Sequence, residues 1–401
     1  MAGRRRASRA GLSLVLLLAV LVGCGGRASS DTVSAEVQRV LDLRAAAVLA
    51  RDEPAYRATG RPAGADPAFA NLRAVPLESW AYRVTDVHRT GDRATADAQL
   101  RYRIEGYDAA PVTVGRTLRL VRAGGTWYVA SDEPAKKASE QLWEQGPVTV
   151  VHGEHSLALG VGQSAERLRD YAGLADRAVP AASGAWGTDW SRHVVVLVPK
   201  SLEGMAGLLG APASGYRGIA AVTTGEAGGS GKAPADRIIV NPDAFGVLGD
   251  FGKQVVLTHE TTHVATRAHT SAATPLWLSE GYADWVGYRG SGRTASQVAP
   301  ELERAVRDGS LPAALPVDGD FGFSGDAARL ARAYEGGWLA CRLIADRWGE
   351  VRLNDFYRAV GDHDKRAVAV EDALRDVLHT TPERFTAQWR DYLRAQLLPA
   401  G

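Results

Sequence analysis

Cysteine and methionine are scarce in this chain of 401 residues, which contains only two of each. So few cysteines cannot form the dense disulfide framework that holds small secreted domains together. The hydrophobic residues make up 45% of the chain, which is enough for each of two domains to bury a core without such bridges. The sequence therefore predicts more than one ordinary globular domain.

An excess of charge of either sign is also missing, since 47 basic residues face 46 acidic ones. This balance excludes the basic footprint that nucleic-acid binding requires, and it gives no broad basic face for an anionic membrane. No Gly-x-Ser-x-Gly motif occurs, so a serine hydrolase of that type has no support. Gly231-Lys232 is not a phosphate loop, because Glu226 and Ala233 occupy positions that need glycine and a hydroxyl residue.

The longest apolar run near the N-terminus is too short to span a bilayer. It covers residues 12–22, follows arginines at positions 4–6 and 9, and has the length of a signal-peptide core. It ends in Leu-Val-Gly-Cys at residues 21–24, which resembles a bacterial lipobox. The resemblance implies a signal peptide over 1–23, a lipid on Cys24 and an extracytoplasmic, membrane-anchored protein. A plain secretory signal with a chance cysteine is the alternative.

The remaining cysteine, Cys341, then has no partner for an intramolecular disulfide, and we expect it to be a small buried residue on a helix. Residues 24–31 are small and polar, and we interpret them as a tether between the anchor and the folded part.

Residues 32–140 are predicted to form an α+β domain. Apolar residues recur at helical spacing from Val33, and after residue 80 they alternate with a period of two in four segments, as in an antiparallel meander. The last hairpin ends in Gly-Thr-Trp-Tyr-Val at 125–129, and on this feature the domain resembles the cone-shaped SnoaL-like fold. That fold hosts enzymes, binding pockets and spacers, and we favour a structural module.

Residues 146–398 are predicted to form a second domain, with a mixed sheet followed by helices, so the fold class of the chain is α+β. Strands are expected at 148–151, 194–198, 219–222 and 238–240, with a helix at 165–174 and a hairpin loop at 225–236. Further helices are expected at 251–268, 276–289, 327–348, 350–360, 367–379 and 382–397.

Within this domain, residues 259–263 have the sequence His-Glu-Thr-Thr-His. On a helix, His259 and His263 lie on the same face one turn apart, where both imidazoles can bind one metal ion. Glu260, beside the first ligand, can then act as the general base on the attacking water. A solvated or core histidine pair is the alternative, and the apolar residues 255–257 argue against a surface pair.

A third ligand is predicted on the next helix. Glu280 follows His263 by 17 positions. Two histidines and one glutamate leave a fourth zinc position open, which is the catalytic pattern. Asp284 lies one turn after Glu280 and can accept a hydrogen bond from a ligand imidazole, most plausibly His259. The alternative for Asp284 is an exposed charge on the helix.

His-Glu-x-x-His at 259–263 followed by Trp-Leu-x-Glu-Gly-x-Ala at 277–283 resembles the gluzincin metallopeptidases, in particular the bacterial peptidase-MA-like group. The resemblance implies a zincin-like catalytic domain, a bound Zn²⁺ and peptide hydrolysis. It also implies a phenol that stabilises the oxyanion, for which Tyr334 is the candidate, although it could equally pack in the core. Tyr282 and Tyr288 are weaker substitutes. The strand at 218–223 is either an edge that pairs with an extended peptide or an ordinary strand.

We therefore expect a lipid-anchored zinc peptidase that acts on a peptide or protein substrate and binds no nucleic acid. The alternative is a non-enzymatic envelope lipoprotein with a structural or vestigial zinc site and an N-terminal domain that binds a partner. A metal hydrolase with a non-peptide substrate also stays open. The sequence does not specify an oligomeric state.

Overall fold

The computed structural model describes residues 26–60, 67–224, 235–323 and 326–398. The predicted signal run and Cys24 lie outside these residues, as does most of the predicted hairpin loop at 225–236. Within the described part, no helix combines the length and the apolar character needed to cross a bilayer.

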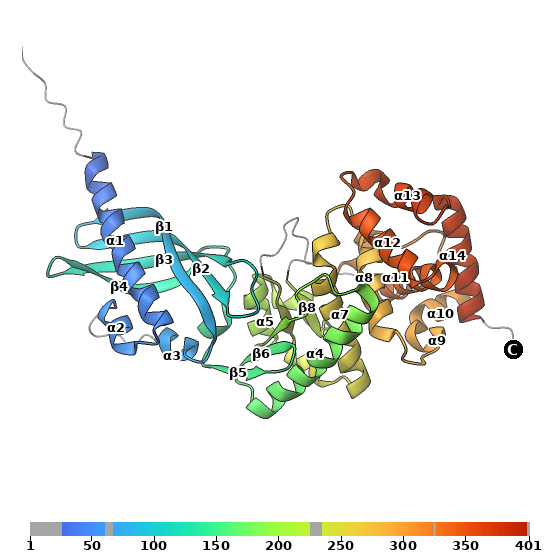
Figure 1. Cartoon of the computed structure of the whole chain (residues 1–401), viewed down its shortest axis with the longest axis horizontal. Helices are drawn as coiled ribbons and strands as arrows, with labels where there is room; N and C mark the ends of the chain where they lie inside the picture. Colours follow the sequence, from blue (N-terminus) through green and yellow to red (C-terminus); the bar gives the residue numbers. More distant parts are fainter. Residues whose placement is uncertain (1–25, 61–66, 225–234, 324–325, 399–401) are drawn as a thin grey trace, which may run out of the picture.

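The N-terminal part consists of a long helix and an antiparallel sheet. Helix α1 (Gly26–Leu49) packs against a four-stranded meander of β1 (Leu77–Thr90), β2 (Arg93–Ile104), β3 (Val112–Ala123) and β4 (Thr126–Pro134), as Figure 1 shows. The short helices α2 (Glu53–Ala58) and α3 (Ala68–Leu72) connect α1 to β1. Helix α1 and the four strands lie where the hydrophobic period predicted a helix and a meander, whereas α2 and α3 were not predicted.

The predicted tether at 24–31 is corrected in part, because α1 is already helical from Gly26. Extending a helix that has already nucleated costs little free energy. Residues 33–48 form that nucleus, because their apolar face packs on the sheet.

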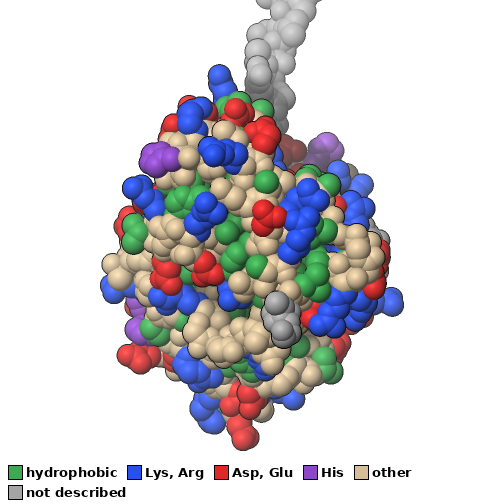
Figure 2. Space-filling model, turned by 90° about the vertical axis from the view of Figure 1, so that its right-hand side faces the viewer, with side chains coloured by type: hydrophobic (Ala, Val, Ile, Leu, Met, Phe, Trp, Pro, Cys, Tyr) green, Lys and Arg blue, Asp and Glu red, His purple; other side chains and the backbone are tan. Residues whose placement is uncertain are grey.

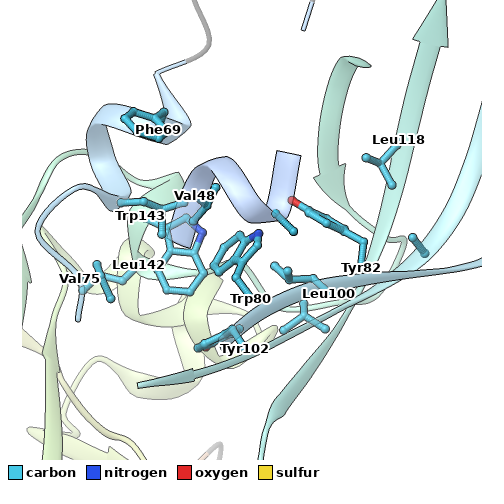
Figure 3. Packing of buried hydrophobic residues seen from close by; sticks show 14 of the residues in the cluster. Val48, Phe69, Val75, Trp80, Tyr82, Leu100, Tyr102, Leu118, Leu142 and Trp143 are labelled. Carbon is cyan, nitrogen blue, oxygen red and sulfur yellow. The ribbon is translucent and has the colours of Figure 1, made fainter. Parts of the chain in front are cut away.

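The core of this part combines aliphatic and aromatic side chains on the covered face of the sheet. Alternate residues of β2 are buried, as expected for a strand with one covered face. Figure 3 shows Trp80 and Tyr82 of β1 beside Tyr102 of β2, with Trp143 from the segment that leads out of the sheet. The ring centroids of Trp80 and Trp143 are 5.5 Å apart, so this segment packs against the core.

The central part is a mixed five-stranded sheet with the order β5-β6-β7-β9-β8. Its strands are β5 (Val148–His152), β6 (Ser156–Val161), β7 (Val194–Val198), β8 (Ala221–Thr223) and β9 (Ile238–Val240). The pairs β6–β7 and β7–β9 are parallel, and the two outer pairs are antiparallel. The short strand β8 therefore forms one edge.

Both faces of this sheet are covered. Ala158, Val196 and Ile238 pack with helices α4 (Ala165–Trp186) and α7 (Asp250–Thr266) on one face. Leu157 and Leu197 belong to the same apolar cluster as the aromatic core of the N-terminal part. The two predicted domains thus share one continuous core across the sheet.

A buried ion pair adds to this junction. Both oxygens of Asp108, in the turn between β2 and β3, accept hydrogen bonds from the guanidinium of Arg237 at 2.7 Å each. The pairing is bidentate and both groups are buried, which is the geometry that favours arginine over lysine. The ion pair fixes the N-terminal part to the start of β9.

The last part is helical, as predicted, and lies at the right of Figure 1. Figure 2 views this end of the molecule and shows basic and acidic side chains intermixed over it, in keeping with the balanced composition. Its helices are α8 (Leu276–Tyr288), α9 (Ala295–Val298), α10 (Pro300–Arg307), α11 (Ala327–Trp348), α12 (Glu350–Gly361), α13 (Arg366–Asp376) and α14 (Pro382–Leu397). Cys341 is buried on α11, as expected. The predicted α+β fold class is confirmed.

Helices α8 and α11 approach each other unusually closely at two glycines. A methyl group added to Gly281 would lie 2.3 Å from the backbone of Gly337, far inside van der Waals contact. Since Gly281 follows Glu280, this close approach also sets where that carboxylate lies.

Gly281→Ala is therefore expected to destabilise the fold by about 3 kcal/mol, because the helices must move apart. Gly184→Ala on α4 is the matched control. Nothing lies within 4 Å of its added methyl, and alanine favours the helix, so we expect no loss of stability there. Chemical denaturation of both variants measures the difference. Equal stabilities would contradict the close packing.

Candidate metal centre

Helix α7 places both histidines inside the protein. It lies between α4 and α8 and contacts the edge strand β8, so all residues from Leu257 to Thr266 are buried or half-buried. The spacing of four residues puts His259 and His263 one above the other, and their Nε2 atoms are 2.9 Å apart.

Glu280 on α8 completes the cluster. Its Oε2 lies 3.2 Å from Nε2 of His259 and 3.7 Å from Nε2 of His263. Four ligands at 2.0–2.1 Å around a tetrahedral zinc are about 3.3 Å from one another. The three distances between ligand atoms, 2.9, 3.2 and 3.7 Å, lie on both sides of that value. The ligand atoms of the three residues all lie within 4.8 Å of one another. The residues predicted to bind zinc are thus brought together in a geometry that fits it.

The charges of the cluster also suit a cation. Burial raises the pKa of Glu280, but the imidazoles of His263 and His259 outweigh burial and hold it well below its usual range. Glu280 is therefore a buried anion. Burial lowers the pKa of His259, but the nearby carboxylates outweigh it and raise the pKa well above its usual range. The cluster therefore holds positive charge readily, either as a proton or as a metal ion.

Asp284 lies where the sequence predicted it, one turn after Glu280. Its Oδ1 is 2.8 Å from Nδ1 of His259, and its side chain is mostly buried. A neutral His259 ring that donates from Nδ1 keeps the lone pair on Nε2, the atom that faces Glu280 and His263.

Asp284→Asn is expected to lower zinc affinity about 10–100-fold, because the amide carries no charge to support the ligand imidazole. Competition with a chromophoric chelator measures this. Asp170→Asn, on the exposed face of α4, is the control and is expected to match the wild type. An Asp284→Asn variant with wild-type affinity would show that this hydrogen bond does not tune the metal site.

Glu260 is buried beside the cluster. Its Oε2 accepts a hydrogen bond of 2.7 Å from the hydroxyl of Thr223 on β8. The sequence did not single out Thr223 for this contact, because 37 residues separate the two and only the order of the strands brings them together.

The tyrosines around the centre differ in position. The ring of Tyr334 on α11 lies 6.4 Å from the ring of His259, so it borders the site. Tyr288 shares a cavity of about 300 Å³ with Tyr334 and Asp284, and burial together with the Asp284 carboxylate raises its pKa to about 12. Tyr282 is fully buried and donates to Asn354, away from the metal ligands.

Strand β8 occupies the edge of the central sheet, the position considered for pairing with an extended peptide. It pairs with β9 along one side through Ala221, Val222 and Thr223. Its contact with α7 places this edge next to the metal cluster.

No family model matches the chain, and the comparison with curated proteins found no match either. Among solved structures, an M1 zinc metallopeptidase mutant from Deinococcus radiodurans, bound to a Tyr-Ser-Ala substrate, is 12% identical with a TM-score of 0.35. That match covers 76% of this chain and 61% of the other. Native yeast LTA4 hydrolase is 12% identical with a TM-score of 0.34, over 70% of this chain and 44% of the other.

A SEC-C motif containing protein from Rhodopseudomonas palustris matches a smaller part. It is 21% identical with a TM-score of 0.22, over 26% of this chain and 81% of the other. Scores and identities of this size do not establish a shared activity for any of the three. The residues of the candidate metal centre therefore carry the functional inference.

Proposed function

We propose that this protein is a zinc-dependent peptidase. The observation that carries the proposal is the convergence of two imidazole nitrogens and one carboxylate oxygen within 4.8 Å, with a buried glutamate next to the first ligand in sequence. The resemblance of residues 259–263 and 277–283 to gluzincins supports it. A purely structural zinc site would have no use for Glu260.

In the proposed mechanism, His259, His263 and Glu280 hold the metal. When bound, zinc would polarise the peptide carbonyl and make the attacking water more acidic. Glu260 takes a proton from that water and delivers it to the leaving amine, so no covalent intermediate with the enzyme forms. Asp284 holds the His259 ring in the required tautomer.

The surroundings of the cluster supply the other proposed roles. Tyr334 would donate a hydrogen bond from its phenol hydroxyl to the oxyanion that develops on the carbonyl. The cavity lined by Tyr288, Tyr334 and Trp338 would receive a side chain of the peptide, and its aromatic walls favour an apolar one. An extended substrate would lie along the edge strand β8.

The test is digestion of a mixed peptide library by the purified protein, followed by mass spectrometry, with and without a zinc chelator. We expect cleavage that the chelator stops and zinc restores. Cleavage of ester or amide compounds but of no peptide would favour a metal hydrolase with a non-peptide substrate. Zinc binding without any turnover would favour the non-enzymatic lipoprotein.

We further propose that the protein is exported and anchored by a lipid on Cys24, outside the cytoplasmic membrane. The support is the sequence of residues 4–24, with its arginines, its short apolar run and its lipobox-like end. In a bacterial host, the wild type is expected in the membrane fraction and Cys24→Ser in the soluble fraction or uncleaved. A Cys24→Ser protein that is processed and retained like the wild type would contradict lipidation.

A further inference from the structure

The hydroxyl of Thr223 contacts the proposed general base from the edge of the sheet. Its Oγ1 lies 2.7 Å from Oε2 of Glu260 and 3.1 Å from the backbone oxygen of the same residue. A hydroxyl carries one hydrogen, and a carboxylate is the stronger acceptor, so the shorter contact is the hydrogen bond. Thr223 is 0% exposed and Glu260 is 6% exposed, so water does not compete with this bond.

We propose that Thr223 is a positioning residue that holds the Glu260 carboxylate in one orientation for proton transfer. This inference rests on the proposed function, since it assigns Glu260 the role of base. A glutamate has several rotatable bonds, and fixing them costs free energy unless a contact holds the end of the side chain. Among the described residues, no other group donates a hydrogen bond to this carboxylate, and Oε1 is left to take the proton.

Hydrogen bonds also hold the chain next to Thr223. The next residue, Thr224, accepts a hydrogen bond on its backbone oxygen from Nη2 of Arg267, at 2.7 Å. Arg267 directly follows α7 and also pairs with Asp236 at 2.9 Å. The hydrogen bond from Arg267 therefore links the end of β8 to the end of α7, the helix that carries Glu260. This link helps to keep Thr223 close to the Glu260 carboxylate.

A second set of contacts links β8 to the N-terminal part. The hydroxyl of Thr224 accepts a hydrogen bond of 2.9 Å from the backbone nitrogen of Arg237. The side chain of Arg237 forms the buried ion pair with Asp108. The end of β8 is therefore held both by Arg267, which follows α7, and through Arg237 by the N-terminal part. A residue that positions a catalytic group needs such support.

The test compares three substitutions in the full chain. Thr223→Val keeps the shape and removes the donor, Thr223→Ala is a second variant without a hydroxyl, and Thr223→Ser keeps the hydroxyl. We expect kcat to fall about 10–100-fold in the first two, with KM and zinc content unchanged. Thr223→Ser should stay within about threefold of the wild type, because its donor is retained.

Crystal structures of the zinc-loaded wild type, Thr223→Val and Thr223→Ser give a readout that does not depend on activity. We expect one Glu260 conformation in the wild type and in Thr223→Ser, and a displaced or split carboxylate in Thr223→Val. If the wild type cleaves no peptide, the proposed function fails, and these structures still decide whether Thr223 orients Glu260.

Four results would overturn the proposal. The first is an unchanged Glu260 conformation in Thr223→Val. The second is an active wild type with an equally active Thr223→Val. The third is a Thr223→Ser variant as impaired as Thr223→Val, which would assign the effect to packing. The fourth is a loss of zinc in Thr223→Val, which would assign it to the metal site.

Discussion

Glu260→Gln is expected to bind zinc like the wild type and to lose roughly 10³-fold in kcat. The amide has the size of the carboxylate and can still accept a hydrogen bond from Thr223, so the helix and the metal ligands should not move. It cannot take a proton from water at neutral pH, and proton transfer is the only task assigned to this residue. Turnover of a cleaved library peptide and zinc analysis of the same sample measure both effects.

Two outcomes would count against this role of Glu260. Wild-type turnover in Glu260→Gln would mean that another group accepts the proton. Loss of zinc together with activity would mean that Glu260 supports the metal. Glu166→Gln, on the exposed first turn of α4, is the control for the substitution itself and should change neither quantity.

Glu280→Ala is expected to lose tight zinc binding, with affinity lower by about 10³-fold, and with it all measurable hydrolysis. The two imidazoles would remain on α7, but they would lack the anion that draws the metal to them. Burial makes this loss large, because the Glu280 carboxylate is held ionised between His259 and His263 and is the carboxylate that faces Nε2 of both imidazoles.

The measurement is zinc stoichiometry after dialysis against a weak chelator, with Glu166→Ala as the matched exposed control. We expect about one zinc per chain in the wild type and the control, and almost none in Glu280→Ala. If Glu280→Ala retained one tightly bound zinc, Glu280 would not be a ligand, and the third ligand would have to come from elsewhere.

Much of the fold could be predicted from periodicity. The four strands of the N-terminal part and the helices from α11 to α14 lie close to their expected bounds, because each has a long, regular apolar pattern. Helix α4 runs past its predicted end at 174 to Trp186, although it contains Pro180. Buried alanines beyond that point pack on α7 and the sheet, and this packing outweighs the cost of the proline.

Other elements could not be predicted locally. Strand β6 is a short apolar run of six residues, and its sequence does not distinguish a buried strand from part of a helix. Helices α9 and α10 lie between 289 and 327, where no helix was predicted, since four to eight residues are too few to show a period. The shared core between the two predicted domains follows from tertiary packing alone.

The residues of the proposed metal site were predictable for a different reason. His259 and His263 are adjacent on one helix, so their spacing determines their geometry before the fold is known. Glu280 and Asp284 needed only a second helix at a suitable distance along the chain. Thr223 and the ion pair of Asp108 with Arg237 join segments 37 and 129 residues apart, and no local pattern indicates such contacts.

The most direct test of a zinc-dependent peptidase is reconstitution of the metal-free protein. The wild type would be stripped with a chelator, and zinc would be added back in steps while hydrolysis of a library peptide is followed. We predict no hydrolysis without metal and a linear rise that ends at one zinc per chain. Full hydrolysis by the stripped protein, or none at any zinc content, would contradict the account.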